Sequence, residues 1–357
     1  MKEKVFAAIT ICIGIILALG IAELGLRLFW DHPGFYGTHV HERHPYYHHR
    51  PIPGIQATIA ESEFRHTANH TLQGLRGNQE FATPKPDSVR RILFLGDSFT
   101  YGMGVADQET FVHQVATRFS DDEVANTGAA AYDTRNELAV FDKFGAAFQP
   151  DLTILCFFWN DLEGNLGNAI PDYGFDAEGN CVRKDELDWD ENPMSIAEKG
   201  ELKPVATGWR LKVAIDEGLR GLRYRFFGIR KRFIRTEEQK QKALDITAEL
   251  FDVMRCQAEQ IGTELAVLVI PDQSQIDPED WVKNINPLNY EVQDFLKAYC
   301  ARHGIPLIDP RSQMIASFQE NQVRQYYYYD RHLTAEGHRV IGEVLNEFLK
   351  ARKQNKY

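Results

Sequence analysis

The chain has 357 residues, of which 43% are hydrophobic and 25% are charged, and this composition indicates a folded protein rather than a disordered chain. Forty Lys and Arg against 51 Asp and Glu give a net charge of −11, which argues against a nucleic-acid partner because phosphate contacts need a basic surface. Five cysteines without a Cys-x-x-Cys pair support neither a disulfide scaffold nor a thiolate zinc site.

The N-terminus carries a membrane signal. Residues 5–22 hold no charge, and a helix of that length, at about 1.5 Å per residue, nearly crosses a hydrocarbon core of about 30 Å. Lys2 and Lys4 precede the run and favour a cytoplasmic N-terminus. Because no small-x-small cleavage site follows, we predict that residues 1–30 are an uncleaved anchor. A cleaved signal peptide is the main alternative, and a buried core helix is the other.

Residues 31–88 are interpreted as a stalk or N-terminal extension. They contain eight of the twelve histidines. These are His32, His39, His41, His44, His48, His49, His66 and His70. Their spacing matches no metal-binding helical pair. We therefore predict a polar, aromatic-rich segment near the membrane surface, and neither a metal nor another cofactor.

From residue 89 onward, short apolar runs alternate with stretches of helical period. The predicted strands span residues 91–95, 124–128, 152–158, 265–270 and 305–308. The predicted helices span residues 110–119, 134–148, 239–261, 289–302 and 335–352. This alternation predicts an α/β domain over residues 89–357, with a central parallel sheet covered by helices on both faces in a three-layer, flavodoxin-like arrangement.

An insertion at about residues 162–236 interrupts the alternation. Residues 175–182 resemble a hairpin turn. Residues 185–191 hold five acids, whereas residues 220–235 hold seven bases interleaved with aromatic and aliphatic side chains. The basic segment would lie against anionic lipid headgroups, or it would be a surface helix paired with the acidic stretch. The second interpretation is preferred.

Five polar or small residues stand at ends of predicted elements. Ser98, in Gly96-Asp97-Ser98, follows the first strand, Gly128 ends the second, and Asn160 follows the third. Asp330 and His332 precede the last helix. Each alone has a plain explanation as a cap, a turn or a surface charge. Together they favour a catalytic cleft, because ligands bind beyond the carboxyl ends of parallel strands.

These residue types fit nucleophilic attack on an ester. We expect Ser98 to attack, His332 to accept its proton, and Asp330 to orient His332. The N–H groups of Ser98 and Gly128 and the side chain of Asn160 would stabilise the oxyanion. His338, six residues after His332 in the last predicted helix, is the rival base.

These residues form four sequence blocks, which are Gly96-Asp97-Ser98, Gly128, Asn160-Asp161 and Asp330-x-His332. The blocks resemble the four conserved blocks of the SGNH, or GDSL, hydrolase superfamily, and the resemblance covers roughly residues 89–351. Residues 69–77 also look like the Asn…Gly-x-Arg segment of membrane-anchored bacterial members, and residues 23–27 look like the end of their anchor. The resemblance implies a serine esterase with a Ser98–His332–Asp330 triad that uses no cofactor.

Two positions depart from the superfamily pattern. Phe158 stands where the third block usually has glycine, and this change would narrow the cleft or alter the oxyanion hole. The acid of the last block usually lies three residues before the histidine, where this chain has Tyr329, but here it is Asp330. The shorter Asp-x-His spacing is similar to that of the alginate O-acetyltransferase branch.

The function that we predict is hydrolysis of an O-acyl or O-acetyl ester, on a carbohydrate or another cell-envelope molecule, by a single-pass protein whose catalytic domain lies outside the cytoplasm. One alternative is an O-acyltransferase that acetylates an envelope polysaccharide with a membrane partner. The other is a non-catalytic envelope scaffold.

Overall fold

The structure is a computed structural model that describes residues 2–30, 38–168, 171–185, 200, 203–204, 210–227, 234, 236–277 and 288–354. Its centre is a five-stranded, fully parallel sheet with the order β13-β12-β8-β6-β7. The strands are β6 (Arg90–Gly96), β7 (Asp122–Asn126), β8 (Leu152–Phe157), β12 (Glu264–Val269) and β13 (Leu307–Ile308). All five lie at the predicted places, although β13 is shorter than predicted.

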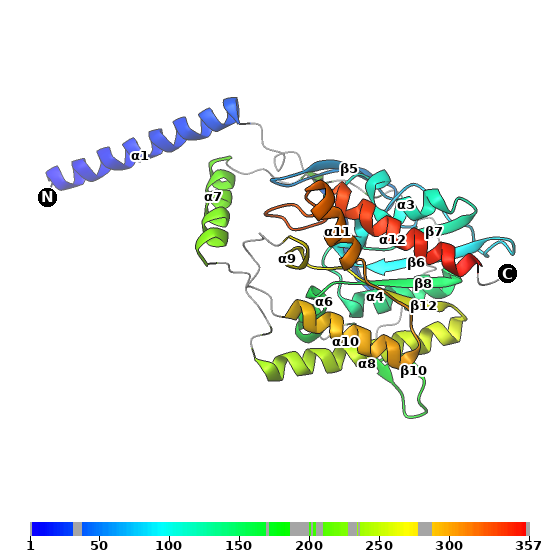
Figure 1. Cartoon of the computed structure of the whole chain (residues 1–357). Helices are drawn as coiled ribbons and strands as arrows, with labels where there is room; N and C mark the ends of the chain where they lie inside the picture. Colours follow the sequence, from blue (N-terminus) through cyan, green and yellow to red (C-terminus); the bar gives the residue numbers. More distant parts are fainter. Residues whose placement is uncertain are drawn as a thin grey trace.

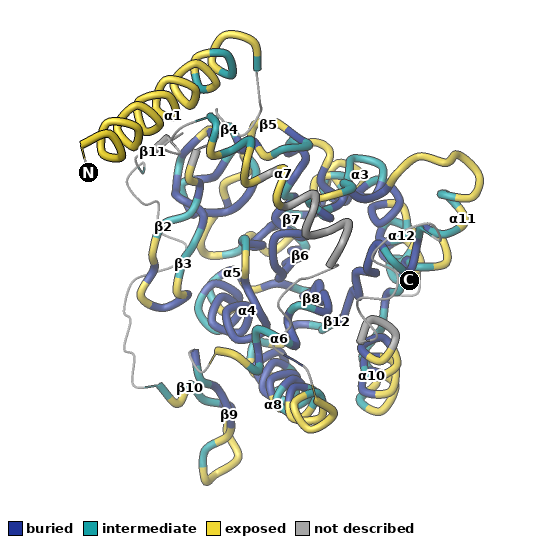
Figure 2. Tube along the Cα trace, turned by 90° about the vertical axis from the view of Figure 1, so that its left-hand side faces the viewer, coloured by how far each residue is buried: buried dark blue, intermediate teal, exposed yellow. Residues whose placement is uncertain are grey.

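Helices cover both faces of the sheet (Figure 1). One layer contains α3 (Phe111–Arg118), α11 (Arg311–Asn321) and α12 (Ala335–Gln354). The other contains α4 (Thr134–Val140), α6 (Asn160–Gly167), α8 (Glu237–Ile261) and α10 (Leu288–His303). The predicted three-layer α/β/α fold is therefore confirmed, and the strands between the layers are buried (Figure 2).

The strand order creates a switch point between β6 and β8. The chain leaves β6 toward β7 at one edge and then returns through β8 toward β12 and β13 at the other. In such doubly wound sheets, the crevice at the switch point is where ligands bind. The pairing aligns Gly96 of β6 with Cys156 of β8. The residues that follow these two strands, Ser98 and Asn160, therefore emerge at the same sheet edge.

Several elements differ from the prediction. The helix expected over residues 134–148 is α4, then a π-helical turn (Phe141–Gly145), then α5 (Ala146–Phe148). Helix α11 was not expected, and α7 (Arg210–Phe227) overlaps the preferred surface helix at residues 220–227 but begins ten residues before it. The hairpin at 175–182 is confirmed by β9 (Tyr173–Phe175) and β10 (Cys181–Arg183). A disulfide between Cys181 and Cys256 ties this hairpin to α8.

The preferred pairing of the acidic and basic stretches lies outside the described residues. Of the five acids, only Asp185 is described, and it pairs with the neighbouring Arg183. Of the basic stretch, residues 220–227 continue α7, while 228–233 and 235 are not described.

Residues 38–81 do not stand apart as a stalk. They form two antiparallel hairpins, β2 (His41–His44) with β3 (His48–Pro51) and β4 (Gln56–Ala60) with β5 (Arg65–Asn69). Upstream of them, β1 (Thr38–His39) pairs with β11 (Lys203–Pro204). The hairpins share an apolar core with Tyr101 of the main domain. Its buried members are Val40, Ile52, Ile55, Ala57, Ile59, Phe64, Ala68 and Tyr101. These contacts join the N-terminal extension to the main domain.

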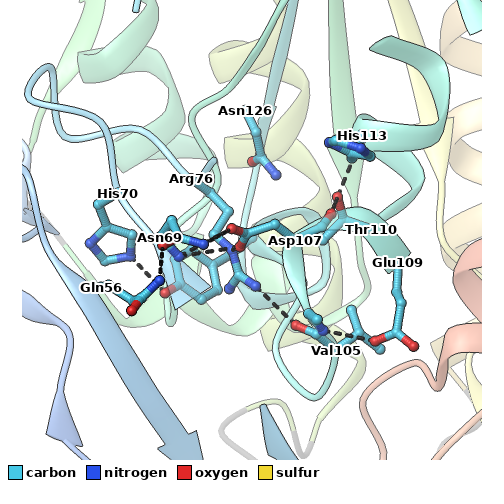
Figure 3. A network of polar contacts seen from close by, with 12 residues as sticks. Gln56, Asn69, His70, Arg76, Val105, Asp107, Glu109, Thr110, His113 and Asn126 are labelled. Atoms are coloured by element: carbon cyan, nitrogen blue, oxygen red, sulfur yellow. Dashed lines mark hydrogen bonds and ion pairs between the residues drawn. The ribbon is translucent and has the colours of Figure 1, made fainter. Parts of the chain in front are cut away.

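A buried ion pair fixes this extension to the domain (Figure 3). Arg76 Nε contacts Asp107 Oδ1 at 2.5 Å, and their side chains are 1% and 8% exposed. The backbone N–H of Asn69 donates to the same carboxylate at 3.2 Å. The Arg76 guanidinium lies 4.6 Å from the centre of the Tyr101 ring, whose hydroxyl contacts His70 Nε2 at 2.7 Å.

Helix α1 (Lys2–Phe29) is exposed along its length and extends away from the domain (Figures 1 and 2). It is long and apolar enough to cross a membrane, with a mean hydropathy of 2.8 in its most apolar window. An anchor and a signal sequence both meet this description.

We expect Asp107→Ala to lower the free energy of unfolding by about 3–5 kcal/mol, because Arg76 would stay buried without its counter-charge. Urea unfolding of the full chain in detergent measures the loss. Glu343→Ala is the matched control, since it removes a carboxylate that pairs with Arg339 and is 62% exposed, and it should cost less than about 1 kcal/mol. Equal losses in the two variants would contradict the prediction.

Candidate active site

Ser98 sits at a tight strand-to-helix junction. Strand β6 ends at Gly96, and the short helix α2 (Ser98–Tyr101) begins two residues later. Asp97 caps this helix, because its Oδ1 accepts the Phe99 N–H at 2.9 Å. The helix ends at Gly102, whose φ of 87° is readily adopted only by glycine. This geometry holds the Ser98 side chain at the sheet edge, 8% exposed.

The structure brings the three predicted triad residues together. His332 Nε2 lies 2.8 Å from Ser98 Oγ, and His332 Nδ1 lies 2.5 Å from Asp330 Oδ1. The order carboxylate, imidazole, hydroxyl is the one in which a histidine can take a proton from serine while a carboxylate fixes its tautomer. The hydroxyl and the imidazole are more than 230 residues apart along the chain but lie within hydrogen-bond distance in the fold.

The loop that carries Asp330 and His332 is anchored through Arg331. Arg331 has a φ of 73°, an unfavourable value for a residue with a side chain. Its guanidinium is buried and donates to Asp272 Oδ1 at 3.0 Å. Asp272 Oδ2 also accepts from the indole N–H of Trp159 at 3.1 Å. The carboxylate of Asp272 thus joins this loop to the residue that precedes Asn160.

Two of the three predicted oxyanion donors are the N–H of Ser98 and the amide of Asn160, which contacts Asp97, the residue before Ser98. Asn160 Nδ2 donates to Asp97 Oδ2 at 3.2 Å, next to Ser98 in the chain. The Ser98 N–H is at the first position of α2, where a helix has no internal acceptor. Among the described residues it has no hydrogen-bond partner.

Gly128, the third predicted oxyanion donor, lies in the loop after β7. Its N–H donates to Asn126 Oδ1 at 3.0 Å, so this donor is already engaged. A Cβ at this position would lie 2.4 Å from the backbone nitrogen of Tyr101. Glycine is therefore required here for the close approach of α2 to the loop after β7.

Aromatic rings line the serine side of the site. The Phe158 and Phe99 rings are 4.2 Å apart, and the Phe99 and His332 rings are 5.0 Å apart. Phe158 is buried, and its backbone N–H donates to Asp161 Oδ2 at 3.0 Å. The side chain that replaces the expected glycine therefore packs beneath Phe99 as part of the wall of the site.

Three buried carboxyl groups lie behind Ser98. Burial raises the pKa of Asp97 to about 6, although hydrogen bonds from Phe99 and Asn160 oppose the shift. Burial and then the charges of neighbouring acids raise the pKa of Glu137 and Asp161 well above their usual range. Burial thus disfavours the charged form of Glu137 and Asp161.

The rival base His338 is part of the core. It lies in α12 with no exposed surface, and its Nδ1 accepts the backbone N–H of Phe111 at 3.2 Å. Burial lowers the pKa of His338 to about 3. It is a neutral packing residue with a structural hydrogen bond.

The histidines of the extension are also used in packing. His49 Nε2 contacts the carbonyl of Ala130 at 2.7 Å, and His41 Nε2 accepts the N–H of the same residue at 3.3 Å. Burial lowers the pKa of His70 to about 4 and that of His41 to about 3. Within the part of the chain that the structure describes, no three His, Cys, Asp or Glu residues form a candidate metal site.

Sequence reasoning missed Asp272 and Glu63, both of which contact the loop that carries Asp330. Asp272 had a usable signal, because it follows Pro271 at the end of the fourth strand, just as Asn160 follows the third. Glu63 lies in the turn between β4 and β5, and no motif marks it.

Comparison with family models matches residues 94–340 to the GDSL-like Lipase/Acylhydrolase family. No curated protein matches the chain.

Solved structures with a similar fold include three from bacteria. A lipolytic protein of the G-D-S-L family from Veillonella parvula is 14% identical, with a TM-score of 0.42, covering 72% of this chain and 97% of that one. A mutant of an acetyl-xylooligosaccharide esterase from Geobacillus Stearmophilus is 10% identical, with a TM-score of 0.40 and coverages of 72% and 92%. A lipase/acylhydrolase from Enterococcus faecalis is 13% identical, with a TM-score of 0.39 and coverages of 74% and 96%. These likenesses concern the fold alone.

We expect Asp97 to make stability fall as pH rises from about 4 to 6. Its pKa is raised from 3.8 to about 6, so in this window the folded state keeps a proton that the unfolded state has lost. Above pH 6 the penalty is constant, at about 3 kcal/mol. Urea unfolding of the parent and Asp97→Asn from pH 4 to 7 measures the effect, together with the change that loss of the Asp97 charge causes in the titration of Glu137 and Asp161. A pH-independent difference between the two proteins would contradict this assignment.

Proposed function

The chain belongs to the GDSL-like lipase/acylhydrolase family and is an ester-hydrolysing enzyme, and from this premise we propose that it acts through a Ser98–His332–Asp330 triad. The observation that carries the proposal is the continuous hydrogen-bonded path from Asp330 Oδ1 through the His332 ring to Ser98 Oγ. A serine that only lies on the surface, or an aspartate that only caps a helix, does not require this hydrogen-bonded arrangement.

In the proposed mechanism, Ser98 Oγ attacks the ester carbonyl while His332 Nε2 takes its proton. Asp330 holds the Nδ1 proton and stabilises the imidazolium. His332 then gives the proton to the leaving alcohol, and an acyl group remains on Ser98. Water, activated by His332 in the same way, releases the acid.

The Ser98 N–H and the Asn160 amide are the donors that we propose for the oxyanion. Asn160 has a second amide hydrogen beside the one that it gives to Asp97. The Gly128 N–H can donate to the oxyanion only if it gives up its hydrogen bond to Asn126. We therefore propose that it contributes least to oxyanion stabilisation.

We propose a short acyl group, such as acetyl, on a carbohydrate or another molecule of the cell envelope. Phe158 supports the short acyl group, because a buried ring against Phe99 fills space that the usual glycine would leave open. The envelope assignment depends on the side of the membrane on which the domain lies.

Helix α1 is proposed to anchor the domain outside the cytoplasm. At the end of this helix the Glu23 carboxylate accepts the N–H groups of Arg210 and Leu211, at 3.1 and 2.8 Å. Arg210 in turn donates to the carbonyl of Trp30 at 2.8 Å. This joint fixes the start of α7 to the end of α1, and α7 crosses the direction of α1 rather than continuing it (Figure 1).

That geometry would lay α7 along the membrane surface if α1 spans the bilayer. Ile215 and Leu219, one turn apart on α7, are 50% and 52% exposed, as expected of an interfacial helix. The disulfide between Cys181 and Cys256 supports an oxidising compartment on the outer side.

For the triad, we expect Ser98→Ala and His332→Ala to reduce hydrolysis of p-nitrophenyl acetate to near background, because nucleophile and base act as one unit. Asn160→Ala should lower turnover by about 10²–10³, the usual cost of one oxyanion donor. Stopped assays with purified full chain in detergent measure all three. Unchanged rates in Ser98→Ala and His332→Ala would exclude the triad.

The same preparations separate hydrolysis from transfer. An acetylated oligosaccharide acceptor detected by mass spectrometry would support an O-acyltransferase, in line with the Asp-x-His spacing, whereas free acetate alone supports hydrolysis. A Ser98 that does not react with a fluorophosphonate probe would favour a non-catalytic scaffold.

For the orientation, we expect protease added outside sealed bacterial spheroplasts to digest the domain, while an alkaline wash leaves the chain in the membrane. A cytoplasmic marker protein controls for leakage. Protection of the domain in intact spheroplasts would place it on the cytoplasmic side, and release by alkali would mean that α1 is no anchor.

A further inference from the structure

One carboxylate of the N-terminal extension reaches the loop that carries Asp330. Glu63 lies in the turn of the β4–β5 hairpin, more than 260 residues from this loop. Its Oε1 accepts the N–H of Tyr328 at 2.9 Å, and its Oε2 accepts the N–H groups of Tyr329 and Asp330, both at 2.7 Å. Three successive backbone donors thus converge on one side chain.

The surrounding contacts hold this carboxylate in place. The next residue, Phe64, is buried and packs against Tyr327, with 5.0 Å between the ring centres. The Tyr327 hydroxyl donates to the carbonyl of Gly104 at 2.8 Å, and its backbone N–H donates to the carbonyl of His332 at 2.9 Å. The hairpin turn and the loop therefore form one packed unit.

The loop has to be held by contacts with other segments, because one of its residues has an unfavourable backbone conformation. With a single residue between acid and histidine, Arg331 takes a φ of 73°, which costs free energy and persists only where neighbours impose it. Asp272 holds the loop at the Arg331 side chain. Glu63 holds it at the backbone of Asp330, whose side chain contacts His332.

We propose that Glu63 is a positioning residue of the active site, which acts through Asp330 to keep His332 in line with Ser98. The inference rests on the proposed triad. It makes the N-terminal extension a functional part of the enzyme, because the extension supplies the anion that fixes the geometry of the acid loop.

The test compares Glu63→Gln and Glu63→Asp with the parent. A glutamine keeps the size of the side chain but has one carbonyl oxygen, and its NH₂ group would oppose at least one of the three N–H donors. We expect kcat for p-nitrophenyl acetate to fall about 10- to 100-fold in Glu63→Gln with KM nearly unchanged, the effect of a misplaced catalytic group. Glu63→Asp, which keeps the charge, should recover part of the loss.

The matched control is Glu178→Gln. It makes the same change of charge in another hairpin turn, where the exposed Glu178 side chain makes no hydrogen bond or ion pair with any described residue. It should leave kcat unchanged. Thermal unfolding of each variant separates a misplaced loop from a misfolded chain.

A double-mutant comparison decides whether Glu63 acts through Asp330. If it does, Glu63→Gln should have little further effect on kcat in an Asp330→Asn background, because coupled residues are not additive. Parent-like kcat in Glu63→Gln, or a full multiplicative loss in the double variant, would overturn the inference while leaving the triad intact. Full activity in Ser98→Ala would instead overturn the proposed function.

Discussion

The imidazole of His332 has to be held within hydrogen-bond reach of Ser98 by a loop that has no regular secondary structure. The loop closes on itself through the isolated bridge between Tyr326 and Leu333 and through a hydrogen bond from the Arg331 N–H to the Tyr327 carbonyl, at 3.2 Å. Its conformation is imposed from two sides, by Asp272 on the Arg331 side chain and by Glu63 on the backbone. The position of the base is therefore a property of tertiary contacts.

Site residues that are placed by local sequence patterns could be predicted, whereas those placed by tertiary contacts could not. Ser98 and Asn160 follow apolar strand segments, and parallel strands deliver the residues after them to one edge whatever the details of packing. Asp330 and His332 stand directly before a helix that has a clear period. These placements follow from local patterns, so the fold and the meeting of Ser98, His332 and Asp330 were predictable.

Other features depend on contacts between distant segments and had no local signal. Glu63 lies in a turn that reads as an ordinary polar loop, and its importance appears only when the β4–β5 hairpin packs on residues 327–330. The packing of residues 38–81 on the domain had no local signal either, because their apolar residues are sparse in sequence and several of them form a core together with Tyr101. Likewise, the engagement of the Gly128 N–H by Asn126 requires the folded turn.

The acidic side chains around Ser98 differ in how far they are buried. Glu137 and Asp161 have no exposed surface, and burial raises the pKa of each well above its usual range. Asp330, by contrast, keeps 17% of its side chain exposed, so a charged carboxylate costs less there. Asp330 also contacts the His332 ring directly, so among these three acids it is the one placed to stabilise positive charge on that ring.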